Sequence, residues 1–428
     1  MTAVRARFQP SQPDPRLNRL LAGYPADLFT ERLYQSDELA QCYGVEITRR
    51  LLQQLGIAAL LAQGPCSLLT IQQQLAFSPK FQPALDWLLH YADSEQLLTR
   101  SLDASGQPMH RLGLAWSPPA ADILTELRAV GAGIDPGNAA TLDLLDAAAE
   151  AWLQLATDEA SGTEALLGMG QLHLWLSYFN AQNPLYAANN RLAALAAVRC
   201  LQNNLQDSAC PPPWRLLEVG AGAGSGAQAL LHALAEADLL QHIALYRITE
   251  PNAFFRRRAE RELKARYPEL TLAFGSLNID QPWQEQGLAG QNLTKQSGGG
   301  QSRGGQGFDL IYCVNVLHVA KDLQFSLAQA AQWLKPAGWL VSGECLRPLP
   351  DQPVYTELMF RILDSYTQVT LDPAFRPNPG FLTAQQWRTA LRAAGLDQIR
   401  IEPDHELIRA VYPRFLLGAL CAQPMRSG

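Results

Sequence analysis

The chain has 428 residues, of which 47% are hydrophobic and 17% are charged, and its net charge is −6. This composition excludes an intrinsically disordered protein. The negative charge argues against a nucleic-acid partner, because such binding depends on neutralising phosphates. The length predicts two or three domains, since a single hydrophobic core stops growing near about 250–300 residues.

The cysteine pattern and the absence of long apolar segments indicate the compartment. The seven cysteines are scattered, with no CxxC pair and no Cys/His cluster. We therefore expect neither a metal site nor a disulfide framework. The N-terminal residues offer no stretch suited to a signal peptide, and no segment has about 18 consecutive apolar residues. We expect a cytoplasmic protein without a membrane partner.

The first half of the chain is predicted to be mainly helical. Residues 1–16 are predicted to form a flexible arm, and residues 17–205 a helical N-terminal or lid domain. Inside that domain we expect helices over residues 17–66, 69–75 and 81–92, and then a β-hairpin over residues 96–113 with an Asp-Ala-Ser-Gly turn. Helices followed by a hairpin suggest a winged-helix-like unit. The largely apolar helix at 81–92 fits burial in a dimer or domain interface better than contact with DNA.

The second half of the chain has a different pattern. The run Cys210-Pro-Pro-Pro213 predicts a boundary, because prolines end helices and stiffen linkers. From residue 213 to about 420, strands alternate with helices, which is typical of a parallel sheet covered on both faces. The predicted strands are 215–219, 244–249, 270–274, 308–314, 338–343, 398–402 and 406–411, and the predicted helices are 225–237, 254–267, 323–334 and 384–394. Residues 289–307 are predicted to be a surface loop, and the fold class is α/β.

A glycine-rich turn follows the first predicted strand. Glu218 lies in that strand two positions before Gly220, and Gly222 and Gly224 follow at every second position. Glycine accepts positive φ angles and lets a ligand approach the backbone closely. The glycine pattern alone also suits a dinucleotide, but a carboxylate beside a diphosphate would be repulsive. Glu218 suits an ammonium group, directly or through water, and this favours S-adenosylmethionine (SAM).

Two further polar residues follow the next strands. Glu250 ends the second strand, where its carboxylate can accept both ribose hydroxyl protons. Asn278 lies beyond the third strand, where its amide can contact the adenine amino group or simply belong to the loop.

Several segments resemble the class I SAM-dependent methyltransferases, and more narrowly the C-methyltransferase domains of polyketide synthases. They are Leu217–Gly224, Phe308–His318 with its Asn-Val-Leu-His element, Leu334–Leu340, Tyr178–Asn190 and Gly380–Trp387. The resemblance covers about residues 170 to 412, and the helical start of the chain is similar to the dimerisation unit of small-molecule O-methyltransferases. It implies a Rossmann-like class I methyltransferase sheet with a mainly α-helical, winged-helix-like N-terminal domain.

The resemblance also implies site residues. It makes Asn315 a further cofactor-binding candidate, beside the glycine turn, Glu250 and Asn278. It places Tyr178, Asn183 and Tyr186 in a helical lid, where they line the substrate tunnel or the SAM site; packing of aromatic side chains is the alternative.

His318 and Glu344 are the candidate catalytic residues. Each follows one of two consecutive strands, at the carboxyl edge where ligands bind in open α/β sheets. A carboxylate that orients an imidazole makes a general base that works near neutral pH. In the C-methyltransferases that the chain resembles, a His–Glu dyad takes the α-proton of a β-keto thioester, and the enolate carbon then receives the methyl group of SAM.

The preferred function is C-methylation of the α-carbon of a β-keto acyl thioester, or of a related small molecule, in polyketide-type biosynthesis. The substrate is expected to be carried by a partner protein or to be free. O-methylation of a phenol or enol is the alternative, and a non-catalytic SAM-binding regulator is a second one. The run Arg256, Arg257, Arg258 and Arg261 is typical of a solvated helix face, with docking of an acidic carrier protein as the minority interpretation.

Overall fold

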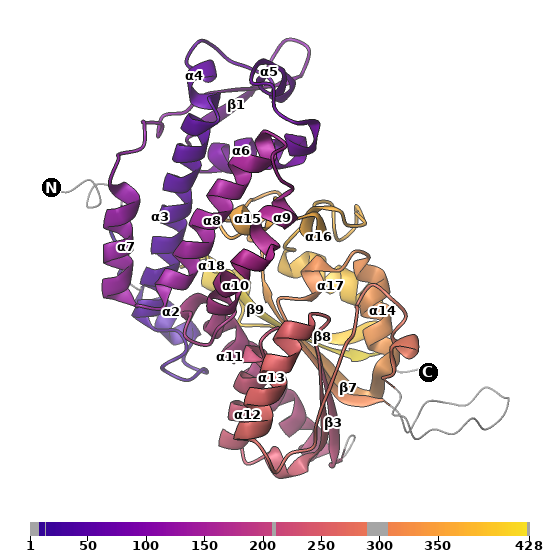
Figure 1. Ribbon diagram of the computed structural model, residues 1–428. Helices are drawn as coiled ribbons and strands as arrows, with labels where there is room; N and C mark the ends of the chain where they lie inside the picture. Colours follow the sequence, from indigo (N-terminus) through magenta and orange to yellow (C-terminus); the bar gives the residue numbers. More distant parts are fainter. Residues whose placement is uncertain (1–7, 13, 208–210, 289–306, 426–428) are drawn as a thin grey trace. The chain divides into compact units, whose positions relative to one another are not determined.

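The computed structural model describes residues 8–12, 14–207, 211–288 and 307–425. It divides into two compact units, and many of their helices and strands are labelled in Figure 1. The helical unit takes the described residues of 1–15, 29–185 and 351–368, and the sheet unit takes those of 16–28, 186–350 and 369–428.

These units differ from the predicted domain boundaries. The segments 16–28 and 186–205 belong with the sheet, and the short segment 351–368 returns to the helical unit. Part of the predicted arm is held in place, because Phe8 is buried and the backbone of Ser11 donates to Glu38 Oε2 at 2.8 Å. Residues 1–7, Cys210 and most of the predicted loop, 289–306, lie outside the described residues.

The helical unit consists of helices and one hairpin. Its elements are α3 (Glu31–Gln54), α4 (Ile57–Leu61), α5 (Leu68–Gln74), η1 (Pro79–Phe81), α6 (Gln82–Ser94), β1 (Leu98–Leu102), β2 (Pro108–Leu112), α7 (Ile123–Ile134), α8 (Asn138–Ala156), α9 (Gly162–Leu167), η2 (Met169–Gln171), α10 (Leu172–Tyr178), α15 (Glu357–Phe360) and α16 (Asp364–Thr367). The predicted hairpin is confirmed: β1 and β2 pair antiparallel. Its turn is closed by Asp103 Oδ1, which accepts from the backbone N–H groups of Ser105 and Gln107.

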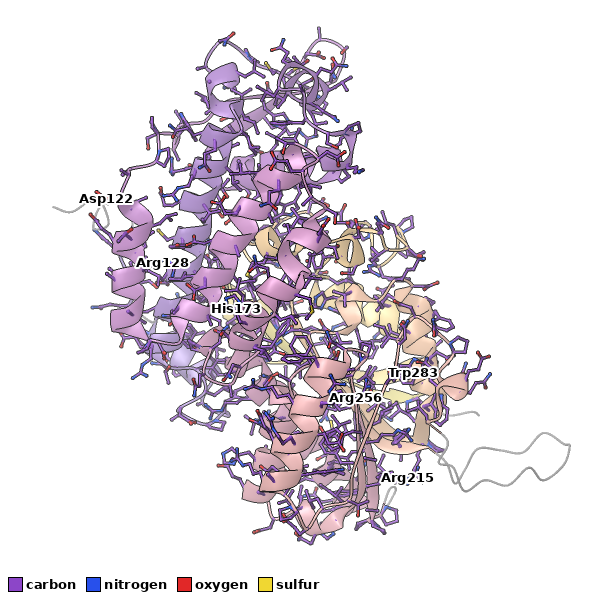
Figure 2. The ribbon with its side chains drawn as sticks, viewed as in Figure 1. Asp122, Arg128, His173, Arg215, Arg256 and Trp283 are labelled. Atoms are coloured by element: carbon purple, nitrogen blue, oxygen red, sulfur yellow. The ribbon has the colours of Figure 1, made fainter. Side chains whose placement is uncertain are left out.

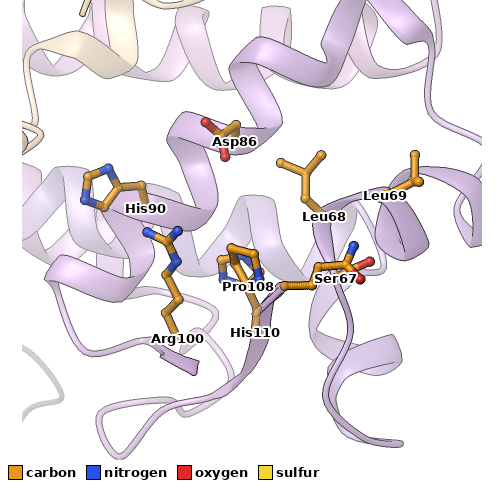
Figure 3. A pocket seen from close by; sticks show the side chains of 9 residues that line it. Ser67, Leu68, Leu69, Asp86, His90, Arg100, Pro108 and His110 are labelled. Carbon is orange, nitrogen blue, oxygen red and sulfur yellow. The ribbon is translucent and has the colours of Figure 1, made fainter. Parts of the chain in front are cut away.

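The apolar face of α6 is covered within its own unit. The ring of Trp87 packs against Trp152 of α8 with centroids 6.0 Å apart, and its indole N–H donates to Glu357 of α15 at 3.2 Å. This helix is therefore buried inside its own unit, whereas the sequence favoured burial in a dimer or domain interface. A separate cavity of about 270 Å³ opens between α5, α6 and the hairpin, lined by Asp86, His90, Arg100 and His110 among others (Figure 3). No predicted site residue lines it.

The sheet unit holds a seven-stranded sheet. Its elements are α2 (Pro15–Leu20, from Arg16 on), α11 (Pro184–Asp207, from Tyr186 on), β3 (Trp214–Val219), α12 (Ser225–Glu236), η3 (Leu240–His242), β4 (Ile243–Thr249), α13 (Ala253–Arg266), β5 (Leu272–Gly275), η4 (Trp283–Gln286), β6 (Phe308–Val314), η5 (Leu317–Val319), α14 (Leu323–Trp333), β7 (Leu334–Cys345), α17 (Ala384–Ala393), β8 (Leu396–Glu402), α18 (His405–Arg409) and β9 (Leu417–Pro424). The strand order is β5-β4-β3-β6-β7-β9-β8. The pairs from β5 to β7 are parallel, and β9 runs antiparallel to β7 and β8.

The two faces of the sheet are covered by different helices. Leu217 and Ile311 share one hydrophobic core with residues of α14 and α17. On the opposite face, the hydroxyl of Tyr312 donates to the carbonyl of Asn190 on α11 at 3.2 Å. The predicted α/β class and its Rossmann-like sheet are confirmed.

One predicted strand is wrong. Residues 406–411 were expected to be a strand, but α18 begins at His405. Its N-cap, Asp404, accepts hydrogen bonds from the backbone of Glu406 and Leu407, which favours a helix start. The last strand is instead β9, which extends to Pro424, beyond the predicted end near 420.

Candidate functional site

The glycine turn joins β3 to α12 at the point where the strand order reverses. Gly220, Gly222 and Gly224 all have positive φ angles, of 67°, 54° and 93°. A Cβ on Gly220 would lie 2.6 Å from Cγ2 of Val316, so the turn packs against the residue after Asn315. The ends of β3 and β6 therefore meet at the switch point of the sheet, where open α/β sheets bind ligands.

Glu250 supports this turn. Its Oε2 accepts from the backbone N–H of Gly222 at 2.9 Å, and its Oε1 accepts from that of Asn252 at 2.8 Å. Burial raises the pKa of Glu250, and the two backbone hydrogen bonds act in the opposite direction. Each carboxylate oxygen can accept a further bond, so the predicted ribose contact is compatible with this arrangement.

Glu218 faces the first turn of α12. Its Oε1 lies 2.8 Å from the position of a Cβ on Gly226, and its Oε2 accepts from the hydroxyl of Tyr246 at 2.7 Å. Burial raises the pKa of Glu218 to about 8. A bound ammonium group would lower it again, because a nearby cation favours the carboxylate. The contact of Glu218 with an ammonium stays a prediction.

The substitution Glu218→Gln is expected to change how stability depends on pH. In the unfolded chain this carboxyl ionises near its ordinary value of 4.5, whereas the folded protein keeps the proton up to about pH 8. The free energy of unfolding therefore falls as pH rises through this window, and the glutamine variant lacks this loss. Urea unfolding of both proteins at several pH values checks it. The prediction would be contradicted if the free energies of unfolding of the two proteins differed by the same amount at acidic and at alkaline pH.

The two candidate asparagines occupy different settings. Asn315 has a φ of 56°, and its Oδ1 accepts from the side chain of Asn189 on α11 at 3.0 Å. Its left-handed conformation turns the chain from β6 toward η5. Asn278 is exposed, and its Oδ1 accepts from the backbone of Asp280 at 2.9 Å, which closes a local turn. Its predicted adenine contact has no support from this geometry.

His318 and Glu344 lie in direct contact. The Nδ1 of His318 lies 2.7 Å from Oε2 of Glu344, and the two residues are 4% and 0% exposed. The other carboxylate oxygen accepts from the hydroxyl of Ser342 at 2.8 Å and from the backbone of Leu317 at 3.2 Å. An acceptor at Nδ1 fixes the tautomer of the neutral ring, so that Nε2 carries the lone pair.

Three supporting residues were not predicted from the sequence. Ser342 holds the carboxylate of Glu344 from two positions earlier on the same strand face. The ring of Phe381 packs against the imidazole of His318 with centroids 4.7 Å apart. Arg376 donates to the carbonyl of His318. The alternation of side chains along β7 could have indicated Ser342, but the other two depend on long-range contacts.

The three predicted lid residues are divided between the units. Tyr178 and Asn183 belong to the helical unit, where the Asn183 side chain donates to the carbonyl of Tyr178 at 3.0 Å and accepts from Thr141. Tyr186 belongs to the sheet unit, where it lies near Ser225 at the start of α12 and burial raises the pKa of its hydroxyl. The structure thus brings Tyr186 to the glycine turn, and the lid role of the other two stays a prediction.

The glycine turn and the helix α11 offer space and unbonded polar atoms for a ligand. A Cβ on Gly222 would meet open space, which leaves room for a ligand at the backbone. Asn190 is 1% exposed, yet neither atom of its amide has a hydrogen-bond partner among the described residues, and Oδ1 of Asn189 has none either. Buried polar atoms are normally bonded, so these amides are suited to an ammonium or a carboxylate.

Residues 217–340 match the family model of the methyltransferase domain, and they span both the glycine turn and His318. This region is a methyltransferase domain. The match agrees with SAM as the methyl donor expected from the sequence.

Curated relatives of the methyltransferase domain are polyketide synthases. Residues of the chain are 26% identical over 198 residues to highly reducing polyketide synthase 40 of Fusarium mangiferae, covering 45% of the chain and 7% of that protein. They are 26% identical over 277 residues to polyketide synthase PksR of Bacillus subtilis (strain 168), covering 64% and 10%. The chain therefore spans a tenth or less of the length of these relatives.

Solved structures share the fold. The CurJ carbon methyltransferase superimposes with a TM-score of 0.68 at 19% identity, covering 97% of the chain and 100% of that structure. The trans-methyltransferase CalH, in complex with SAH, superimposes with a TM-score of 0.57 at 18% identity, covering 92% of each.

The basic run lies on α13, the helix that packs against Gly224 of the glycine turn. Arg256, labelled in Figure 2, donates to the carbonyl of Glu250 at 2.6 Å, and Arg258 pairs with Glu262 at 3.0 Å. Arg257 and Arg261 are exposed. Arg256 therefore has a structural role, whereas Arg257 and Arg261 lie on a solvated face of the helix.

Two structural features are absent from the described residues. No helix in this part of the chain has the length and apolarity needed to cross a membrane. Within the same residues, no group of three or more His, Cys, Asp or Glu side chains is placed to hold a metal ion.

Proposed function

We propose that the chain transfers a methyl group from SAM to the α-carbon of a β-keto acyl thioester, with His318 and Glu344 as the base. The buried contact of 2.7 Å between these two side chains carries the proposal. It lies just after β6, and the neighbouring Val316 contacts the glycine turn. His318 and the glycine turn thus lie at the same edge of the sheet.

His318 would perform the proton transfer. Because Nδ1 is bonded to Glu344, Nε2 takes the α-proton, and the C–H electron pair moves into the enolate. The carboxylate of Glu344 then stabilises the imidazolium that forms. Ser342 and the backbone of Leu317 hold that carboxylate in place, so it does not need to reorganise during the step.

The residues of the turn would hold the cofactor. Gly222 leaves space at the backbone, Glu250 has acceptor capacity for ribose hydroxyls, and Asn190 has an unbonded buried amide. When bound, SAM supplies the electrophilic methyl group that the enolate carbon attacks.

The similarity to polyketide synthases and to a carbon methyltransferase supports carbon as the acceptor and a carrier-bound thioester as the substrate. The carrier protein would then be a partner of this chain. A homodimer through the N-terminal domain and a cytoplasmic location stay predictions from the sequence.

The proposal is tested with SAM that carries an isotopically labelled methyl group and a β-ketoacyl thioester on a carrier protein. We expect label in the acyl chain, detected by mass spectrometry after the thioester is cleaved. A C-methyl group survives mild acid, whereas the methyl group of an enol ether is released. Acid-labile label would instead identify an O-methyltransferase. SAM binding without transfer to thioesters, phenols or enols would favour the regulator.

A further inference from the structure

A buried arginine holds the backbone of the turn that carries the candidate base. Arg376 is 0% exposed. Its Nη2 donates to the carbonyl of His318 at 2.7 Å, and its Nη1 donates to the carbonyl of Ala320 at 2.6 Å. Removing a guanidinium from water is costly, so such a residue is retained where its fork of donors meets a specific set of acceptors.

The segment around Arg376 is built to present these donors. The backbones of Asp372 and Arg376 exchange two hydrogen bonds, of 3.0 and 2.7 Å, which close a tight turn. The backbone of Thr370 donates to the carbonyl of Lys321 at 2.7 Å. The segment 370–376 therefore supplies donors to three carbonyls between residues 318 and 321.

The base-bearing turn needs this support because it is short. η5 (Leu317–Val319) is a single 3₁₀ turn, and its last carbonyls have no partner within the turn itself. At its start, the backbone of Leu317 is bonded to Glu344 at 3.2 Å. The carboxylate thus fixes the beginning of the turn, and the guanidinium fixes its end.

We propose that Arg376 is a positioning residue, which sets the backbone of His318 so that Nδ1 meets Glu344. The proposal rests on the proposed function, in which His318 is the base. A small displacement of a general base lowers the rate of the chemical step far more than it changes substrate binding. Loss of the guanidinium should therefore lower kcat without a matching change in KM or in SAM affinity.

The test compares Arg376→Gln and Arg376→Lys with the wild type in the full chain. We expect kcat of the glutamine variant to fall by at least about tenfold, with KM and the SAM dissociation constant within about threefold. The lysine variant should lie between the two, because one ammonium cannot reproduce the fork. The matched control is Arg199→Lys: Arg199 bonds Glu402 and the carbonyl of Gly23 in the same unit, away from the dyad, and kcat should be kept.

A second readout does not depend on turnover. The proton between Nδ1 of His318 and Glu344 should give a low-field proton NMR signal that is absent from His318→Ala. We expect this signal to be lost or broadened in the Arg376 variants and kept in Arg199→Lys. If Arg376→Gln does not fold, the lysine variant decides the question.

The outcomes separate the two proposals. A folded Arg376 variant with wild-type kcat and an unchanged signal would overturn the positioning role while leaving the proposed function intact. An inactive wild type would reject the proposed function, and the NMR comparison would still decide whether Arg376 positions His318.

Discussion

The variant His318→Ala should lose methyl transfer almost completely. Removal of a general base typically costs about 10²- to 10⁴-fold in rate. The imidazole packs against Phe381 and is bonded to Glu344, neither of which is a predicted cofactor contact, so its loss should leave SAM binding nearly unchanged. Single-turnover kinetics measures the first effect, and isothermal titration with SAM measures the second.

Two companion variants sharpen this result. Glu344→Gln keeps the shape of the side chain but places a donor among groups that all donate to it, so we expect a smaller loss of roughly 10- to 100-fold. His110→Ala is the control, because His110 is 5% exposed in the helical unit and His318 is 4% exposed. It should cost stability and keep kcat. Turnover that survives in His318→Ala would show that the base is assigned wrongly.

Gly222→Ala should weaken SAM binding while the protein stays folded. The added Cβ meets nothing within 4 Å in the protein, so the substitution costs only the strain of a positive φ, about 1 kcal/mol. If the cofactor lies against this backbone, the alanine side chain occupies part of the space that the cofactor needs. We expect the SAM dissociation constant to rise by about 10- to 100-fold, which corresponds to roughly 1.4–2.8 kcal/mol.

Gly220→Ala is the matched comparison, and it should lower the stability of the fold more than the affinity for SAM. Its Cβ would lie 2.6 Å from the stiff side chain of Val316, so the fold itself is strained, by about 1–3 kcal/mol. The second substitution Val316→Ala should recover part of that stability. Calorimetry without SAM measures the loss of stability in Gly220→Ala, and calorimetry with SAM measures the loss of affinity in Gly222→Ala. Equal SAM affinity in Gly222→Ala and the wild type would show that the cofactor does not lie against this turn.

The parts of the fold that were predicted correctly have strong local signals. β6 is buried along its whole length, and its largely apolar sequence, interrupted by Asp309, predicted the strand with its observed bounds. Parallel strands end at the same edge of the sheet, and the structure places the glycine turn and the Asn-Val-Leu-His element at the ends of the neighbouring strands β3 and β6. The contact between His318 and Glu344 followed from the same reasoning.

The remaining features depend on information that local patterns do not contain. Arg376 is 58 residues from His318 and recognises backbone carbonyls, which have no sequence signature. The return of residues 351–368 to the helical unit depends on contacts such as the bond from the indole of Trp152 to the carbonyl of Leu358. At residues 406–411 a strand was predicted, although Asp404 was already a helix-start signal.

The antiparallel pairing of β7 with β9 ties the base to the last strand of the sheet. Glu344 on β7 lies opposite Gly418 on β9, and β8 is joined to the sheet only through β9. During synthesis, β7 stays an open edge until the ribosome has released residues 417–424. A chain that stops before residue 417 would carry every predicted site residue and still expose the backbone beside Glu344. Such a product would be prone to edge-to-edge association, so catalytic competence would arise only when the final strand is in place.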